Sequence, residues 1–235
     1  MRKIQLKQVL RNKRFVLFTI ILPIGWYIFF DQLQKGISPS ILLGIAVFIG
    51  VIGNSLATFS KRIASDIGFY SFESHFTSYS VKNYLWDQSI VQLILNSLIF
   101  LAVLVVAVLG FHFPVTTSLL VQFFLLSLMG IYFSVIGFVL GVRVDAKTID
   151  TIGFPVIILA AMTIIPFDTL GASGGFMDLV GKLQRVFPGY YYTKLIQDLT
   201  EKQTIDATLL ALFVAVFGLN LLFFYLLVPK GKMGN

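Results

Sequence analysis

Residues 41–59 read ILLGIAVFIGVIGNSLATF, a run without a single charged side chain. A helix needs about 20 mainly apolar residues to cross the ~30 Å hydrocarbon core of a lipid bilayer. In lipid, every backbone N–H and C=O group has to be bonded within the protein, and a helix achieves this locally. The stretch Ile41–Phe59 therefore predicts a transmembrane helix.

Five further apolar stretches predict five further spans, so that the chain is expected to be an all-α polytopic membrane protein with six transmembrane helices. The stretches are Phe15–Phe30, Ile90–Leu109, Leu119–Leu140, Ile152–Ile165 and Ala207–Val228. Ile152–Ile165 is short, which is typical of a re-entrant or buried segment as much as of a full crossing. We keep it as the fifth span because the charge distribution requires one there. No small-x-small cleavage site follows the first stretch, which favours an uncleaved anchor over a signal peptide.

Composition agrees with a membrane environment. Hydrophobic residues make up 57% of the 235 residues and charged residues 12%, whereas soluble domains average ~25% charged residues. This excludes a soluble enzyme, a disordered tail and a collagen-like or coiled-coil rod. The chain has no cysteine, hence no disulfide and no thiolate metal site, and its two histidines lie outside the apolar stretches. We therefore expect no bound metal.

Lysine and arginine are distributed unevenly over the segments between the spans. Thirteen of the 18 lie before the first span, after the second and fourth spans, and in the tail. Such residues concentrate on the cytoplasmic side of a membrane. With six spans both termini are then cytoplasmic, in a multi-pass protein of the cell membrane. The net charge of +7 is explained by topology and by anionic lipid headgroups, so no nucleic acid partner is expected.

The predicted spans carry almost no ionisable residue, since Asp31, Asp87 and Arg143 lie at their ends. Carriers driven by an ion gradient usually have a charged group inside the membrane. The chain also lacks a phosphate-binding loop, a Gly-x-Ser-x-Gly elbow and a His-Glu-x-x-His motif. We therefore expect no enzymatic activity and no cofactor in this chain, and any transport would draw its energy from another protein.

Small and polar residues within the spans indicate how the helices meet. Gly137-x-x-x-Gly141 and Gly130-x-x-x-Ser134 in the fourth span are typical of close helix packing, either within one bundle or between subunits. Uncharged polar residues are expected either to bond a neighbouring helix or to line a translocation cavity; the candidates for such a cavity are Asn54, Thr58, Gln92 and Asn96.

Two segments outside the spans have unusual composition. The leader, residues 1–14, has six cations and no acid, which is typical of an interfacial amphipathic helix or of a plain positive anchor. The cytoplasmic stretch of residues 60–89 is rich in aromatic residues, which indicates a partner surface or rings lying in the headgroup layer. Its candidate contact residues are Gly68, Phe69, Tyr70, Phe72, Glu73, Phe76 and Tyr79.

With this layout the chain resembles the permease subunit of a type-2 ATP-binding-cassette (ABC) exporter over its whole length, as a single permease domain of residues 1–235. Arg62, Asp66 and Gly68 resemble the turn after span two, and Ser78-Tyr79-Ser80 resembles the end of the coupling helix, with tyrosine in place of proline. Ile165-Pro166-Phe167 and the stretch from Phe187-Pro188-Gly189 to Tyr192 resemble the proline-bounded outer insertion between spans five and six.

The resemblance implies a pair of permeases, identical or not, each docked on a separate cytoplasmic ATPase that binds ATP and magnesium. Residues 60–89 would be the coupling segment. Residues 166–206 would form two short re-entrant helices, with an outer gate at Pro166, Pro188 and Tyr190. A hydrophobic or amphipathic cargo such as a drug, lipid or antimicrobial peptide suits the uncharged spans. The alternatives are a non-transporting immunity or scaffold protein and, ranked lower, an ion-coupled carrier.

Overall fold

The computed structural model describes residues 6–7, 10–11, 13–33, 38–73, 81–165, 167, 174–201 and 204–227. These residues form helices joined by short connections, with no strand among them. The all-α class predicted from the apolar stretches is thus confirmed for this part of the chain.

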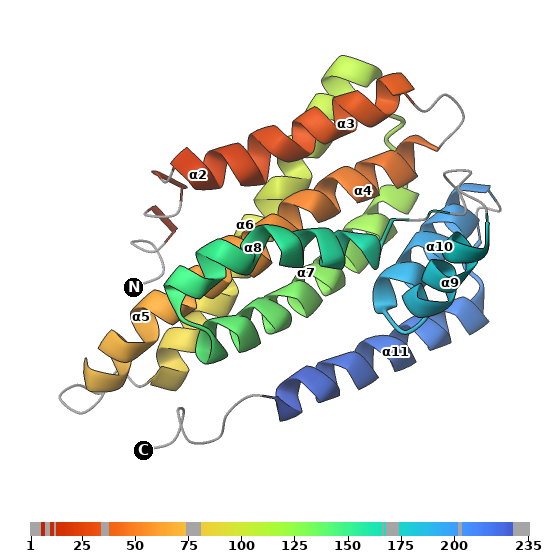
Figure 1. Cartoon of the computed structure of the whole chain (residues 1–235). Helices are drawn as coiled ribbons and strands as arrows, with labels where there is room; N and C mark the ends of the chain where they lie inside the picture. Colours follow the sequence, from red (N-terminus) through yellow and green to blue (C-terminus); the bar gives the residue numbers. More distant parts are fainter. Residues whose placement is uncertain are drawn as a thin grey trace.

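Six long helical stretches run back and forth between two ends of the molecule, and two short helices precede the last of them (Figure 1). The first stretch contains α2 (Lys13–Val16), the π-helix η1 (Leu17–Ile21) and α3 (Leu22–Leu33), and the second contains α4 (Pro39–Ile52), the π-helix η2 (Gly53–Phe59) and α5 (Ser60–Glu73). They are followed by α6 (Val81–Phe111), α7 (Ser118–Arg143), α8 (Ala146–Met162), α9 (Gly175–Gln184), α10 (Pro188–Glu201) and α11 (Ala207–Leu226).

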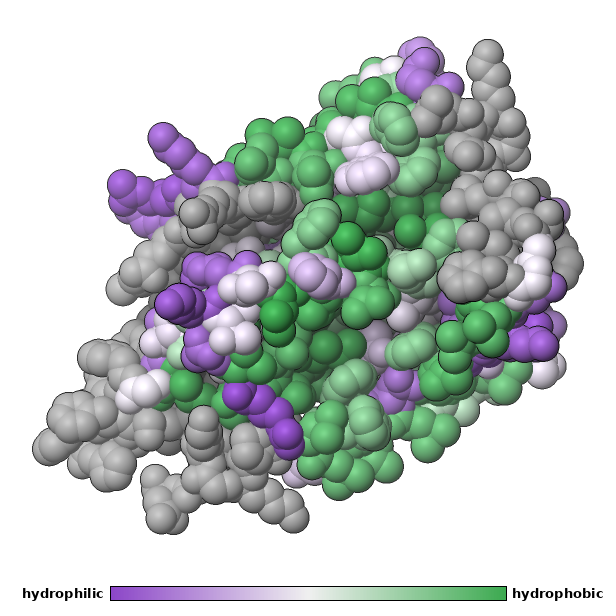
Figure 2. All heavy atoms as spheres, in the orientation of Figure 1, coloured by the Kyte–Doolittle hydropathy of each residue, from purple (hydrophilic) through white to green (hydrophobic). Residues whose placement is uncertain are grey.

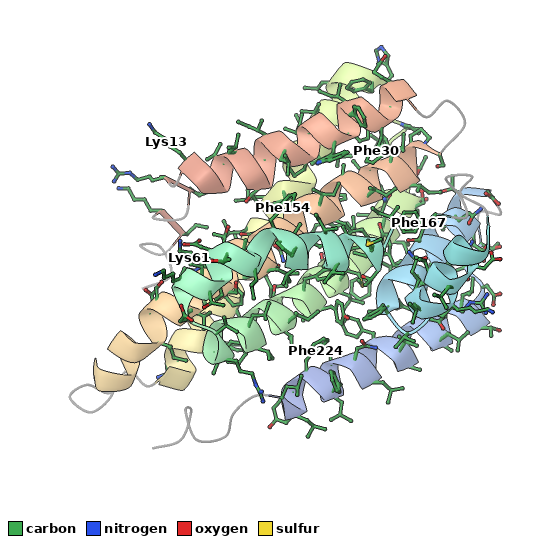
Figure 3. The ribbon with its side chains drawn as sticks, viewed as in Figure 1. Lys13, Phe30, Lys61, Phe154, Phe167 and Phe224 are labelled. Atoms are coloured by element: carbon green, nitrogen blue, oxygen red, sulfur yellow. The ribbon has the colours of Figure 1, made fainter. Side chains whose placement is uncertain are left out.

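The alternation brings chemically similar segments to the same end. Lys13 and Lys61 lie at one end of the bundle, and Phe30 and Phe167 lie at the opposite end (Figure 3). The beginning of α8 and the end of α11 lie at the lysine end as well (Figure 1). We refer to these as the basic end and the outer end.

Among the described residues, four helices are long and apolar enough to span a membrane: Pro39–Gly68, Trp86–Phe111, Ser118–Arg143 and Ala207–Leu226. The chain therefore has the character of a multi-pass membrane protein. Neither the stretch Lys13–Leu33 nor α8, which has 17 residues, is among the four. Four of the six predicted spans thus correspond to helices that are long and apolar enough to cross a membrane, and the six-span count stays a prediction.

The stretch that first predicted a span is the centre of the bundle. The apolar window of Pro39–Gly68 is 83% buried inside the protein, whereas that of α11 is 6% buried. Around this central helix the other helices expose large apolar side chains, among them Leu101 and Leu109 of α6 and Leu219 and Phe223 of α11. Figure 2 shows hydrophobic residues over the middle of one face, with hydrophilic residues toward its ends. Such an apolar surface is typical of a protein surrounded by the hydrocarbon chains of lipids.

Glycines of α7 allow the central helix to approach closely. A Cβ atom on Gly137 would overlap the backbone carbonyl oxygen of Ser55, and one on Gly141 would lie 2.5 Å from the carbonyl oxygen of Ser60. Close approach through small residues is the usual way in which helices associate in lipid. Of the two alternatives for Gly137-x-x-x-Gly141, packing within one bundle is the one that the structure displays.

Where the structure describes it, the predicted cytoplasmic stretch of residues 60–89 is helical. Ser60–Glu73 continues the central helix, and residues 81–89 are the first turns of α6. The reason is that Ile63 is fully buried and packs with Phe59 and Val142, so apolar contacts hold the helix beyond the span. Within the leader, Leu6 packs against Val91 and Leu95 of α6.

Asp145 begins α8 as its N-cap, and its charge should contribute to stability. The carboxylate accepts hydrogen bonds from the Thr148 hydroxyl (2.6 Å) and from the backbone N–H groups of Thr148 and Lys147 (both 3.0 Å). Chiefly through the Thr148 hydroxyl, these bonds lower the pKa of Asp145 below its usual value. The contribution is therefore present above the unfolded pKa and is lost as the pH falls through the lower folded pKa.

We expect Asp145→Ala to lower the Tm at neutral pH, and this difference from the wild-type chain to shrink once the pH falls below about 4. Asp145→Asn keeps a capping oxygen without the charge and serves as the control, measured by thermal unfolding in detergent. A difference between wild type and Asp145→Ala that persists unchanged in acid would contradict the role of the ionised carboxylate.

Candidate functional site

A cluster of polar side chains lies in the apolar middle of the bundle, where η2, α6 and α7 meet. Asn54 Nδ2 donates to Asn96 Oδ1 at 3.1 Å, and Gln92 Nε2 donates to Ser55 Oγ at 3.1 Å. Ser55 Oγ also lies 3.4 Å from Ser134 Oγ. Asn54, Ser55 and Gln92 are fully buried, and Asn96 is 6% exposed. The buried polar cluster thus joins three helices by uncharged hydrogen bonds.

Local sequence explains how the buried polar cluster is accommodated. Gly130 leaves room for Asn96, because a Cβ atom at Gly130 would lie 2.8 Å from Asn96 Nδ2. Asn54 and Ser55 are on the π-helix η2, a backbone form that is rare and frequent at functional sites. The first helical stretch also contains a π-helix, η1, which packs against η2.

Arg62 extends the buried polar cluster toward the basic end. Its Nη2 donates to Gln92 Oε1 at 3.4 Å, and its Cζ lies 5.5 Å from the centre of the Phe59 ring. Our sequence reasoning assigned Arg62 to a solvated turn. The apolar neighbours Phe59 and Ile63 on the same helix were the signal that could have placed it beside the bundle instead.

The four predicted cavity residues are only partly brought together. Asn54, Gln92 and Asn96 bond one another or a neighbouring helix, and Thr58 is half-buried on η2. Asn96 lines a cavity of about 20 Å³, which has the size of roughly one water molecule. In this conformation these residues join helices, and their role in a cargo path stays a prediction.

The predicted outer gate lies at the outer end, where α9 and α10 are attached to α8. Gln184 Nε2 donates to the carbonyl oxygens of Met162 (2.7 Å) and Ile165 (2.8 Å), and the Thr193 hydroxyl donates to that of Ile164 (3.1 Å). These bonds satisfy the last carbonyl of α8 and two carbonyls of the turn that follows it. Gln184 and Thr193 were missed by sequence reasoning, since each looks like an ordinary polar residue of a loop.

The gate residues themselves occupy different positions. Pro188 is buried at the start of α10, where a proline is favoured. Tyr190 is half-buried, with the cationic groups of Arg185 and Lys194 at 5.9 and 6.0 Å from its ring centre. Pro166 lies outside the described residues.

Tyr192 of α10 connects the outer end to the central helix. Its ring meets Phe48 edge to face at 4.6 Å, and its hydroxyl occupies the space where Gly44 has no side chain. The space left by Gly44 thus allows α10 to pack closely against α4, the outer half of the central helix.

Those of the predicted coupling residues that the structure describes lie in α5, at the basic end. Gly68 is exposed in α5, and Phe69, Tyr70, Phe72 and Glu73 belong to its last turns, whereas Phe76 and Tyr79 lie outside the described residues. Nearby, Lys61 Nζ forms an ion pair with Asp150 Oδ2 of α8 at 2.5 Å. Arg143 Nε donates to the carbonyl oxygen of Leu227 at 2.7 Å, just after α11. Polar contacts thus tie α5, α7, α8 and α11 together at this end.

A larger apolar groove, of about 440 Å³, lies between α7, α8, α9 and α11. Its wall contains Tyr132 and Phe133 of α7, Val156 and Leu159 of α8, Leu183 of α9 and Phe224 of α11. No charged residue is among those that line it. Leu56 of η2 also lines the groove, and no sequence pattern predicted it, because its lining comes from five separate helices.

The fold and these contacts define a helical multi-pass membrane protein with a buried polar cluster. No family model, no curated protein and no solved structure matches the chain. Among the described residues no three His, Asp or Glu side chains gather in a way that could hold a metal ion.

Hydrogen bonds of the buried polar cluster can be tested by a double-mutant cycle. In Asn96→Leu the donors of Asn54 and Gln92 lose a shared acceptor, and in Asn54→Leu one of those donors is removed. We expect the two substitutions to be non-additive by about 0.6 kcal/mol, and by at most ~1.7 kcal/mol, in unfolding free energy. Thr151→Ala, which removes only a bond within α8 on an exposed face, is the control and should add to Asn96→Leu without coupling.

Proposed function

We propose that this chain is the permease subunit of an ATP-driven exporter of the type-2 ABC kind. In this proposal it lies in the cell membrane with both termini in the cytoplasm and pairs with a second permease, identical or related. A separate cytoplasmic ATPase binds ATP and magnesium, and the permease forms the path for a hydrophobic or amphipathic cargo.

The observation that carries the proposal is the placement of charge along the long helices. Toward the basic end lie the charged residues of α4–α5, α6, α7 and α8, and α11 has none from Ala207 to Leu226. A group that harnesses an ion gradient has to sit within the membrane. Since the charged residues of these long helices lie toward one end and outside their apolar runs, energy for uphill transport would come from a partner, and a partner that hydrolyses ATP acts from the cytoplasm.

Two further features support it. The central helix continues past the apolar run as α5, which offers the ATPase a lever that is rigidly connected to the buried polar cluster. Between α8 and α11 the chain forms two short helices, α9 and α10, and the proposal assigns to them the role of the two re-entrant helices. Movement of α5 would then be passed through the bundle as a rigid-body change between two arrangements.

Reconstitution tests this proposal. We expect the purified chain in sealed vesicles to move no cargo uphill by itself, and to do so with ATP once its ATPase partner is added. An ionophore that dissipates ion gradients should leave that transport intact. Uphill transport by the chain alone, or its loss with the ionophore while ATP is present, would refute the proposal.

A further inference from the structure

The apolar groove has a wall that offers a ligand little besides apolar contact. Its polar side chains are already bonded within the protein: Tyr132 Oη donates to Asn220 Oδ1 (3.3 Å), Thr163 Oγ1 donates to the carbonyl oxygen of Ala160 (2.7 Å), and Gln184 is bound to the end of α8. A polar ligand would lose its hydration there without gaining partners, and that costs free energy. The groove therefore selects an alkyl chain.

The groove opens on the apolar outer surface of the bundle, which is the surface expected to contact lipid. Leu159 is 65% exposed and Leu183 is 57% exposed, and they belong to the groove wall on two different helices. Its volume of about 440 Å³ is within the ~300–1,000 Å³ of small-molecule sites. In Figure 1, α9 lies at the outer end, while α7, α8 and α11 extend from there toward the basic end. An acyl chain that enters the groove beside α9 would therefore lie along these helices.

Two cations flank this wall at the outer end. Lys182 and Arg185 are exposed neighbours of the groove residues Leu183 and Gln184. Asp178, in the first turn of α9, is one turn before Lys182 and offsets them only in part. Basic residues near a membrane surface are attracted by negatively charged lipid headgroups. The positive pair beside an alkyl-selective groove is complementary to a lipid with a negatively charged headgroup.

We infer that the apolar groove binds one acyl chain of an anionic phospholipid, whose phosphate lies against Lys182 and Arg185. The inference rests on the membrane character of the chain and is independent of the proposed transport function. It would hold equally for a protein that transports nothing.

The test uses the full chain purified in detergent and titrated with phosphatidylglycerol or phosphatidylcholine of identical acyl chains, with bound lipids counted by native mass spectrometry. We expect one lipid site that prefers phosphatidylglycerol. The double substitution Lys182→Gln with Arg185→Gln should weaken phosphatidylglycerol binding by roughly 30-fold and leave phosphatidylcholine binding unchanged. Lys147→Gln, an exposed cation at the basic end, is the control for charge.

A second variant tests the groove itself. Ala160→Trp places a large ring in the groove wall and should abolish binding of both lipids, whereas Ala211→Trp on the exposed face of α11 should not. If Ala160→Trp does not fold, the wild-type protein can be tested instead with a phosphatidylglycerol that has a photoreactive acyl chain. An acyl chain bound in the groove should label α8, α9 or α11.

Equal binding of the two lipids by the wild-type chain would overturn the inference. Unchanged binding in Ala160→Trp, or labelling confined to α3 and α6, would overturn it as well. So would a wild-type chain that binds no lipid and becomes monomeric only with Ala160→Trp, since a second copy would then occupy the groove.

Discussion

Gly137→Leu should prevent the bundle from folding. The first atom that any other residue adds at this position would overlap the carbonyl oxygen of Ser55, which belongs to the backbone of the central helix and cannot rotate away. Overpacking of a core typically costs ~1–3 kcal/mol, and here two backbones have to separate, so we expect at least about 3 kcal/mol. Replacing glycine in a helix interior gains only about 1 kcal/mol, which is less than that cost.

The measurement is the yield of monodisperse protein in detergent together with the unfolding midpoint. Gly218→Leu is the matched control, since Gly218 lies within α11 and has nothing within 4 Å of its missing Cβ atom. It should be neutral or slightly stabilising, and Gly137→Ala should already be destabilised. Equal midpoints for Gly137→Leu and Gly218→Leu would mean that α7 does not pack on the central helix as the structure has it.

The contrast between these two glycines illustrates how far the sequence can predict this fold. Apolar runs predict helices because the hydrocarbon thickness sets their length, and small residues one turn apart predict a close approach. Gly137 and Gly141 fulfilled that pattern. The sequence alone does not say which helix they approach, because in lipid the apolar faces toward the core and toward the bilayer have the same composition.

The same limit explains what was missed at the candidate site. Asn54 and Asn96 were recognisable as polar residues within spans, but their pairing depends on the register between η2 and α6. Arg62 was assigned to the cytoplasmic loop because charge was taken as the end of the helix. In the structure the helix ends at Glu73, since Ile63 continues its buried face. The apolar groove depends on the positions of five helices, and no short stretch of the sequence signals it.

The central helix runs unbroken from the buried polar cluster to the basic end. Its contacts therefore determine which parts of the bundle would move when a partner displaces the end of α5. Lys61 and Arg62 lie on this helix, one bonded to Asp150 of α8 and the other to Gln92 of α6. A displacement of the end of α5 thus acts on two neighbouring helices directly. Under the proposed function, changes near Glu73 should affect transport more strongly than equal changes on the exposed faces of α6 or α11.

Phe72→Asp should therefore abolish ATP-driven transport while the protein still folds. Phe72 belongs to the last turn of α5, and under the proposed function a charge there would have to be desolvated when the ATPase docks. Aromatic residues at the centre of an interface typically contribute about 2 kcal/mol or more, so the affinity for the ATPase should fall at least roughly 30-fold. The readouts are co-purification of the ATPase and ATP-dependent uptake in vesicles.

Two variants separate loss of docking from a general effect of charge or of a smaller side chain. Ser65→Asp adds the same charge at an exposed position of the same helix and should leave both readouts unchanged. Phe72→Leu keeps the apolar character and should retain most of the affinity. Since α5 is one rigid helix, an effect of Ser65→Asp as large as that of Phe72→Asp would show that charge on α5, and not contact at its end, controls transport. Full transport in Phe72→Asp would remove α5 from the docking surface altogether.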